Sequence, residues 1–219
     1  MNSLTNGPRP AVTDVVPHGS VLLVVDVQGG VLEESDVGIP KMGDLGGRAW
    51  RANRIRTLVD RAREVGLPVV FVQEVHKRSG IDFGRELDGS EDVHALEGDP
   101  TTDLLDGLEP TADEYLIRKR RYSAFFATEL DLVLRAHRAE AVLLVGGLTD
   151  VCIHYTAVDA HQHDYRVRVI ADCVGGSSRE AHDASLRAIQ YLQRDALVVS
   201  DAVLDELTAG AGVRRRPSA

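Results

Sequence analysis

Four segments of this 219-residue chain place a chemically useful side chain just after a short apolar run. These side chains are a carboxylate, a carboxylate with an imidazole, an amine and a thiol. A thiol that has both a base and a cation within reach can attack a carbonyl carbon and form a covalent intermediate. The residues concerned are Asp26, Glu74 with His76, Lys119 and Cys152.

The segment around Cys152 is the most informative of the four. Gly146 and Gly147 follow an apolar run and permit a tight backbone turn. Thr149 or Asp150 is expected to cap the next helix, which places Cys152 in its first turn. A helix start and a nearby lysine both lower a thiol pKa, and backbone N–H groups there can hold an oxyanion. The alternative is a buried structural cysteine beside a well-capped helix.

Asp26 and Lys119 each have a structural alternative as well. Asp26 directly follows five apolar residues and is either a general base near the thiol or a capping or paired carboxylate. Lys119 is one of four consecutive cations and could lie on a solvated edge. Strand alternation puts Arg118 and Arg120 on the opposite face from Lys119.

The elements that must position these residues alternate between strands and helices. This order predicts a three-layer αβα fold of class α/β, with a doubly wound, mostly parallel sheet of about six strands. The carboxyl ends of parallel strands share one edge, where ligands bind. Residues 81–110 show no period and are expected to form a long loop. The predicted strands cover 21–25, 68–72, 115–119, 141–145, 167–171 and 197–200, and the predicted helices cover 48–65, 128–137, 151–163 and 179–193.

Length, charge and cysteine content exclude several classes of protein. The length fits one domain over residues 1–219, with 1–18 and 212–219 as expected flexible tails. A net charge of −9 argues against nucleic-acid or anionic-membrane partners. No apolar run of about 18 residues occurs. The first 20 residues lack a signal-peptide core, so we expect a cytoplasmic protein. Two cysteines without a CxxC exclude a disulfide scaffold, and Cys173 is interpreted as structural.

The segments LLVVDVQ, IRKRRYSAFF and LLVGGLTDVCIHYTAVDAHQHDYRVRVIADC resemble the isochorismatase-like cysteine hydrolases from about Val21 to Ser200. This resemblance implies a catalytic triad of Asp26, Lys119 and Cys152. It also implies a cis peptide bond between Gly147 and Leu148, and an oxyanion hole formed by the backbone N–H groups of Leu148 and Cys152.

Two differences from other members of this family indicate which of its branches the sequence resembles most. Isochorismatases that cleave a vinyl ether generally lack the cysteine. Nicotinamidases bind a metal through Asp-x-His and later histidines, whereas this chain has Glu74-Val75-His76-Lys77-Arg78 with no matching histidine soon after. We therefore expect no metal and no cofactor. The sequence is similar to the biuret and ureidoacrylate amidohydrolase branch, which makes Glu74, His76, Tyr122 and Phe125 the candidate substrate-binding residues.

The predicted function is cysteine-dependent cleavage of a C–N bond in a small amide or ureide, through an acyl-enzyme, in a homo-oligomer (dimer or tetramer). One alternative is hydrolysis of another bond, such as a lactam, an ester or a vinyl ether. A second is a non-catalytic family member that acts as a binding module. A nucleotide-binding oxidoreductase is disfavoured because Gly29-Gly30 stands where a G-x-G-x-x-G turn would follow the first strand.

Overall fold

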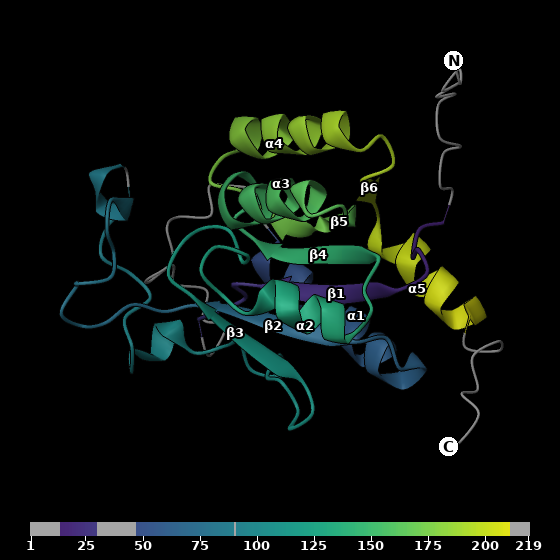
Figure 1. The fold of residues 1–219 in the computed structure, drawn as a ribbon, viewed down its shortest axis with the longest axis horizontal. Coiled ribbons are helices and arrows are strands. Elements are labelled where there is room, and N and C mark those ends of the chain that lie inside the picture. Colours follow the sequence, from purple (N-terminus) through teal and green to yellow (C-terminus); the bar gives the residue numbers. More distant parts are fainter. Residues whose placement is uncertain (1–13, 30–46, 90, 211–219) are drawn as a thin grey trace, which may run out of the picture.

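The computed structural model describes residues 14–29, 47–89 and 91–210. Its centre is a six-stranded sheet in which every pair of neighbours is parallel, in the order β3-β2-β1-β4-β5-β6 (Figure 1). The strands are β1 (Ser20–Val25), β2 (Val69–Glu74), β3 (Tyr115–Lys119), β4 (Ala141–Gly147), β5 (Arg166–Gly175) and β6 (Leu197–Val198).

Helices cover both faces of the sheet, which gives the expected three-layer α/β fold (Figure 1). One face packs against α2, α3 and α4, and the other against α1 and α5. The helices are α1 (Arg48–Val65), α2 (Leu130–Ala136), α3 (His154–Gln162), α4 (Arg179–Leu192) and α5 (Ser200–Gly210). None of the helices among the described residues is long and apolar enough to cross a membrane.

The central strands explain why this architecture forms. All six residues of β1 and the first five of β4 are buried, as expected for strands that have helices on both faces. β1 pairs with both β2 and β4, so the ends of these strands meet at one edge. At that edge Gly146 has a φ of +115°, and a Cβ there would collide with the carbonyl oxygen of Val25. Only glycine allows this close approach of β4 to β1.

Two details differ from the sequence-based expectations. Helix α5 was not predicted, although Ser200 followed by apolar residues at Val203 and Leu207 has a helical pattern. Most of the two predicted tails lies outside the described residues. Within residues 14–18, however, Val16 is buried and the backbone N–H groups of Val15 and Val16 donate to Glu206 in α5.

The long connection between β2 and β3 folds back over the carboxyl edge of the sheet. It contains two short 3-10 turns, Glu86–Asp88 and Pro100–Thr102. Isolated bridges tie His76 to Leu96 and Gln28 to Leu104. The predicted loop at 81–110 therefore forms one wall over the strand ends where the candidate site residues lie.

Candidate active site

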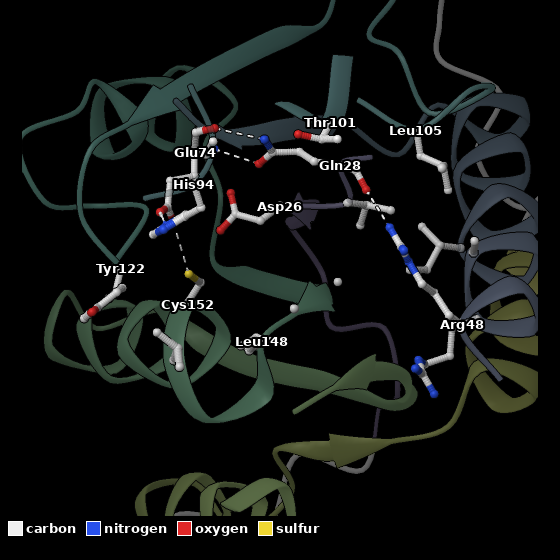
Figure 2. A pocket seen from close by; sticks show the side chains of 18 of the residues that line it. Asp26, Gln28, Arg48, Glu74, His94, Thr101, Leu105, Tyr122, Leu148 and Cys152 are labelled. Atoms are coloured by element: carbon white, nitrogen blue, oxygen red, sulfur yellow. Dashed lines mark hydrogen bonds and ion pairs between the residues drawn. The ribbon is translucent and has the colours of Figure 1, made fainter. Parts of the chain in front are cut away.

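Four strand ends bring the predicted catalytic residues together. Asp26 follows β1, Glu74 and Lys119 are the last residues of β2 and β3, and Cys152 lies shortly after β4. Asp26, Glu74 and Cys152 line one pocket, and Figure 2 shows their side chains converging there. The parallel topology thus places residues far apart in sequence within contact of one another.

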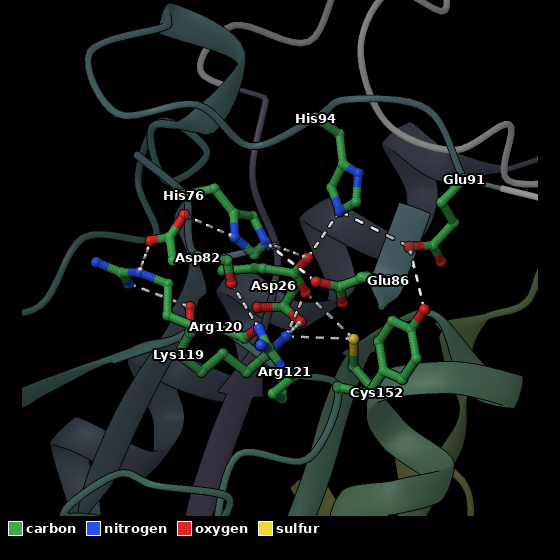
Figure 3. A network of polar contacts seen from close by, with 12 residues as sticks. Asp26, His76, Asp82, Glu86, Glu91, His94, Lys119, Arg120, Arg121 and Cys152 are labelled. Atoms are coloured by element: carbon green, nitrogen blue, oxygen red, sulfur yellow. Dashed lines mark hydrogen bonds and ion pairs between the residues drawn. The ribbon is translucent and has the colours of Figure 1, made fainter. Parts of the chain in front are cut away.

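The ammonium group of Lys119 is the centre of this cluster. Its Nζ lies 2.8 Å from Asp26 Oδ2 and 3.3 Å from Cys152 Sγ, and it also pairs with Glu74 Oε2 (Figure 3). Lys119 is fully buried. Burial favours the neutral amine, but Asp26, Cys152 and Glu74 outweigh it and raise the Lys119 pKa well above its ordinary value. Lys119 therefore stays charged and acts electrostatically.

Asp26 is held in a position suited to proton transfer. Its φ of +51° is uncommon for a residue with a side chain and occurs at the point where β1 ends. Burial raises the pKa of Asp26 to about 6, against the opposing effect of Lys119 and with a further contribution from Glu74. A carboxylate with this pKa is ionised at neutral pH and can still release a bound proton, as a general acid and base must.

The structure corrects the expectation for the thiol pKa. Burial raises the pKa of Cys152 well above its ordinary value; Lys119 opposes this, whereas Asp26 and Glu74 add to it. The effect of the lysine on the thiol pKa therefore does not prevail, because burial and two nearby carboxylates together outweigh it. The resting side chain of Cys152 is therefore a neutral thiol.

The turn that carries Cys152 also differs from the predicted cap. A π-helical turn, Thr149–Ile153, leads into α3, and no side chain caps it. Asp150 instead accepts hydrogen bonds from Ser177, and Thr149 contacts His182 at 2.8 Å. Both side chains thus tie the turn to α4 and to the segment that precedes it. The peptide bond between Gly147 and Leu148 is cis.

Glu74 has a larger part in the site than the sequence indicated. It lines the pocket, but its carboxylate pairs with Lys119 and accepts a 2.7 Å hydrogen bond from His94. Burial opposes its charge, yet Lys119 and the two histidines His76 and His94 hold the Glu74 pKa well below its ordinary value. Gln28 exchanges two 2.9 Å hydrogen bonds with the Glu74 backbone and so joins the ends of β1 and β2.

The other predicted substrate-binding residues divide between the pocket and the interior. Tyr122 lines the pocket and donates to Glu91 at 3.4 Å. Phe125 is not among the lining residues and stacks on His163. His76 is fully buried behind Glu74, stacks on Phe83 at 3.9 Å, and is likewise absent from the pocket lining.

The two cysteines occupy different environments. Cys152 is 6% exposed, at the pocket surface beside Lys119. Cys173 has no exposed surface and packs in the core between the sheet, α1 and α5, although it contributes to the pocket wall. Burial and Asp172 raise its pKa to about 12. These surroundings fit the structural role expected for Cys173.

A set of potential metal ligands, two of which line the pocket, was not anticipated. The ligand atoms of Glu74, His76, Glu86 and His94 lie within 4.8 Å of one another. The expectation that no such set surrounds Glu74 and His76 is wrong, because the β2–β3 connection folds back and brings Glu86 and His94 from 12 and 20 residues away. Carboxylate and imidazole donors suit a divalent transition metal. Both Glu86 oxygens are buried without a hydrogen bond, and Oε2 lies 3.3 Å from Nε2 of His76 as an ion pair.

Comparison with known proteins identifies the family. Residues 20–202 match the family model of the isochorismatase domain. The chain belongs to the isochorismatase family. A "Probable inactive nicotinamidase" of Arabidopsis thaliana is 36% identical over 175 residues, which cover 77% of the chain and 87% of the relative. The maleamate amidohydrolase of Pseudomonas putida is 34% identical over 150 residues, 67% of the chain and 70% of the relative.

Two further relatives carry names that describe cleavage of a C–N bond. The ureidoacrylate amidohydrolase of Serratia proteamaculans is 29% identical over 188 residues, 78% of the chain and 75% of the relative. The crystal structure of the N-carbamoylsarcosine amidase from Thermoplasma acidophilum superposes with a TM-score of 0.66 at 27% identity, over 83% of the chain and 96% of the amidase. The chain is thus an isochorismatase-like protein with amidohydrolase homologues.

Substitutions at Lys119 and at its neighbour Arg118 test which face of β3 points into the site. Lys119→Ala should lower kcat/KM by about 100-fold or more, because the electrostatic partner of the thiol and of Asp26 is lost. Arg118→Ala should change kcat/KM less than about threefold, because Arg118 is exposed on the other face of β3. Steady-state kinetics on a small amide, with circular dichroism to check folding, measures both. A larger loss in Arg118→Ala would contradict the site.

The raised pKa of Asp26 predicts the acidic limb of the pH profile. Only the ionised carboxylate can accept the thiol proton, so kcat/KM should rise with pH up to about 6 and level off above it. The measurement is kcat/KM in overlapping buffers of constant ionic strength. A profile that is flat through this range, or that falls as the pH rises through it, would exclude Asp26 as the base.

Proposed function

We propose that this isochorismatase-family protein is a cysteine-dependent amidohydrolase that cleaves a C–N bond in a small amide or ureide. The observation that carries the proposal is the contact of one buried lysine with both Asp26 and Cys152, at 2.8 and 3.3 Å. A thiol, a carboxylate of raised pKa and a fixed cation at one pocket are the components of acyl transfer by a cysteine. The names of the amidohydrolase relatives support the choice of a C–N bond.

The first half of the proposed reaction forms an acyl-enzyme. Asp26 takes the proton of the Cys152 thiol while the sulfur attacks the carbonyl carbon, and the carbonyl oxygen gains the negative charge. Lys119 stabilises the charge that develops on the sulfur. Asp26 then passes its proton to the leaving nitrogen, the C–N bond breaks, and ammonia or an amine departs.

The second half releases the acid. Asp26 removes a proton from a water molecule, the resulting hydroxide attacks the thioester carbon, and the S–C bond breaks. The sulfur regains a proton from Asp26, which restores the resting thiol. An amide gives a carboxylate, whereas a ureide cut on its carbamoyl side gives a carbamate that decomposes.

The oxyanion hole in this proposal consists of the backbone N–H groups of Leu148 and Cys152. Both residues line the pocket, and Cys152 lies in the turn that begins the helical segment. Backbone donors at a helix start are fixed in place and suit a charge that appears only during the reaction. Gly146, with a φ of +115°, lets β4 approach β1 closely just before this turn.

A metal is not part of the proposed steps. A divalent ion held by Glu74, His76, Glu86 and His94 would supply a Lewis acid that polarises a substrate group in the pocket. The nucleophile, the base and the oxyanion donors all come from the chain itself. Lys119 and His94 already pair with the Glu74 carboxylate, so side chains of the protein already compensate the negative charge of Glu74.

Replacement of the nucleophile tests the proposed function. With a panel of small amides and ureides, the wild-type protein should release ammonia or an amine, and Cys152→Ala should lower kcat/KM by more than about 1,000-fold. Cys173→Ala serves as the matched control and should retain activity, because the Cys173 side chain has no exposed surface although it contributes to the pocket wall. Turnover that survives in Cys152→Ala would exclude the mechanism. Absence of turnover across the panel would favour a non-catalytic protein.

Chelation tests the metal-independent mechanism. Dialysis of the purified protein against a strong chelator should leave kcat/KM within about twofold, because no proposed step needs an ion. Metal analysis of the same samples shows whether an ion was present and removed. Stoichiometric metal that leaves together with the activity, and whose return restores it, would contradict this part of the proposal.

A further inference from the structure

The turn that carries Cys152 lies beyond the last paired residues of the sheet. β4 pairs with β1 up to Gly146 and with β5 up to Gly147, and the turn Thr149–Ile153 follows. Within the turn, backbone N–H groups donate to the Leu148 carbonyl oxygen and fix its shape. The orientation of the turn toward the pocket depends on contacts from outside it.

Thr149, the first residue of this turn, makes such a contact with helix α4. Its Oγ1 lies 2.8 Å from Nδ1 of His182. Thr149 has no exposed surface, and His182 is 7% exposed. Because both partners are buried, water cannot readily replace the hydrogen bond between them. α4 packs beside α3 on the same face of the sheet, so this bond joins the turn to a helix that is anchored in the core (Figure 1).

The segment before α4 lies equally close to the turn. A Cβ on Gly176 would lie 2.7 Å from Asp150 Oδ1 and 2.9 Å from the Cβ of His182. Both distances are shorter than van der Waals contact, so a side chain at Gly176 would displace the turn or the helix. Ser177 also donates two hydrogen bonds to the Asp150 carboxylate. The distance between the turn and α4 is thus fixed from two sides.

His182 is suited to hold a hydroxyl group rather than to meet the substrate. Burial lowers its pKa from the ordinary value, so the ring is neutral near neutral pH. A neutral imidazole has one donor and one acceptor nitrogen, and Nδ1 in either role can pair with a threonine hydroxyl. Neither His182 nor Thr149 lines the pocket that contains Cys152. His182 can therefore act on the reaction only through the turn.

We propose that His182 is a positioning residue, which holds Thr149 and thereby directs the backbone N–H groups of Leu148 and Cys152 at the oxyanion. This inference rests on the oxyanion hole of the proposed function. Leu148 immediately precedes Thr149, and Cys152 follows three residues later, so a rotation of the turn about Thr149 would move both donors. Such donors act through fixed geometry, so a small displacement slows the chemical step more than it weakens substrate binding.

Substitutions of similar size separate the hydrogen bond from side-chain packing. Thr149→Val removes the hydroxyl and His182→Leu removes Nδ1, and each should lower kcat for a hydrolysed amide about tenfold or more, with KM changed less than about threefold. Thr149→Ser keeps the hydroxyl, and His182→Asn places an amide near the position of Nδ1, so both should recover most of the lost rate. The double variant Thr149→Val/His182→Leu should be no slower than the slower single variant, since both changes remove one contact.

An aldehyde probe reads the same geometry without turnover. The Cys152 thiol adds to the carbonyl group of propanal: the S–C bond forms, the carbonyl π bond breaks, and the thiol proton passes to the oxygen, which takes the place of the oxyanion. NMR titration with propanal labelled with ¹³C at the carbonyl carbon gives the dissociation constant of this adduct. Thr149→Val and His182→Leu should each raise it about fivefold or more. Alkylation of Cys152 by iodoacetamide forms no oxyanion, so its rate should change less than about threefold.

Ser20→Ala is the control for a loss of stability alone. Ser20 is buried in β1, and its hydroxyl donates to the Pro17 carbonyl oxygen at 2.6 Å, at the amino end of the strand. This variant should lower the melting temperature and leave kcat and propanal binding unchanged. The inference is overturned if kcat in the His182 variants follows the melting temperature instead of the hydrogen bond, or if alkylation of Cys152 slows as much as propanal binding weakens.

Two further outcomes distinguish this inference from the proposed function. A propanal adduct at Cys152 that depends on His182, without ammonia release from any amide, would refute the hydrolysis and leave the positioning role standing. Ammonia release that depends on Cys152, with kcat and propanal binding unchanged in Thr149→Val and His182→Leu, would support the hydrolysis and overturn the positioning role. A wild-type protein that forms no adduct would also overturn it, because the thiol would then lie beside no oxyanion site.

Discussion

One buried ammonium group determines how the rest of the site is built. Transferring an unpaired charge from water into a protein costs several kcal/mol, so Lys119 must have anionic partners within contact. Asp26 and Glu74 supply two negative charges for one positive charge. Burial, together with this excess of negative charge, disfavours the thiolate of Cys152 at rest, although it lies beside a lysine. In the proposed reaction, deprotonation of the thiol is therefore coupled to attack on the substrate.

The parallel sheet makes this charge cluster possible. Asp26, Glu74 and Lys119 end three strands that are neighbours in the order β1, β2 and β3, and β4 delivers Cys152 from the other side of β1. Each strand is anchored by buried apolar residues, so its polar end is held by the core rather than by the site itself. The energetic cost of clustering the charges is offset by packing elsewhere in the sheet.

The sequence predicted the parts that depend on local pattern. The strand–helix alternation indicated the sheet, and the family resemblance singled out Asp26, Lys119 and Cys152, which the structure brings close together. It could not predict the thiol pKa, since that depends on how many carboxylates share one lysine. It also missed His94, because a residue in a segment without periodicity gives no sign of where its chain will fold back. Helix α5 was missed despite a readable pattern.

The site therefore combines two kinds of structure with different tolerance to change. Strand ends hold the groups proposed to break the bond, and their positions are fixed by the register of the sheet. The pocket walls come from the β2–β3 connection, which contributes Glu91 and His94, and from the start of α1, which contributes Arg48 and Arg51. Neither wall is constrained by strand pairing in the way the strand ends are. Substitutions in these walls can alter the charge that a substrate meets and leave the Lys119 cluster unchanged, which is how one fold accommodates amides of different chemistry.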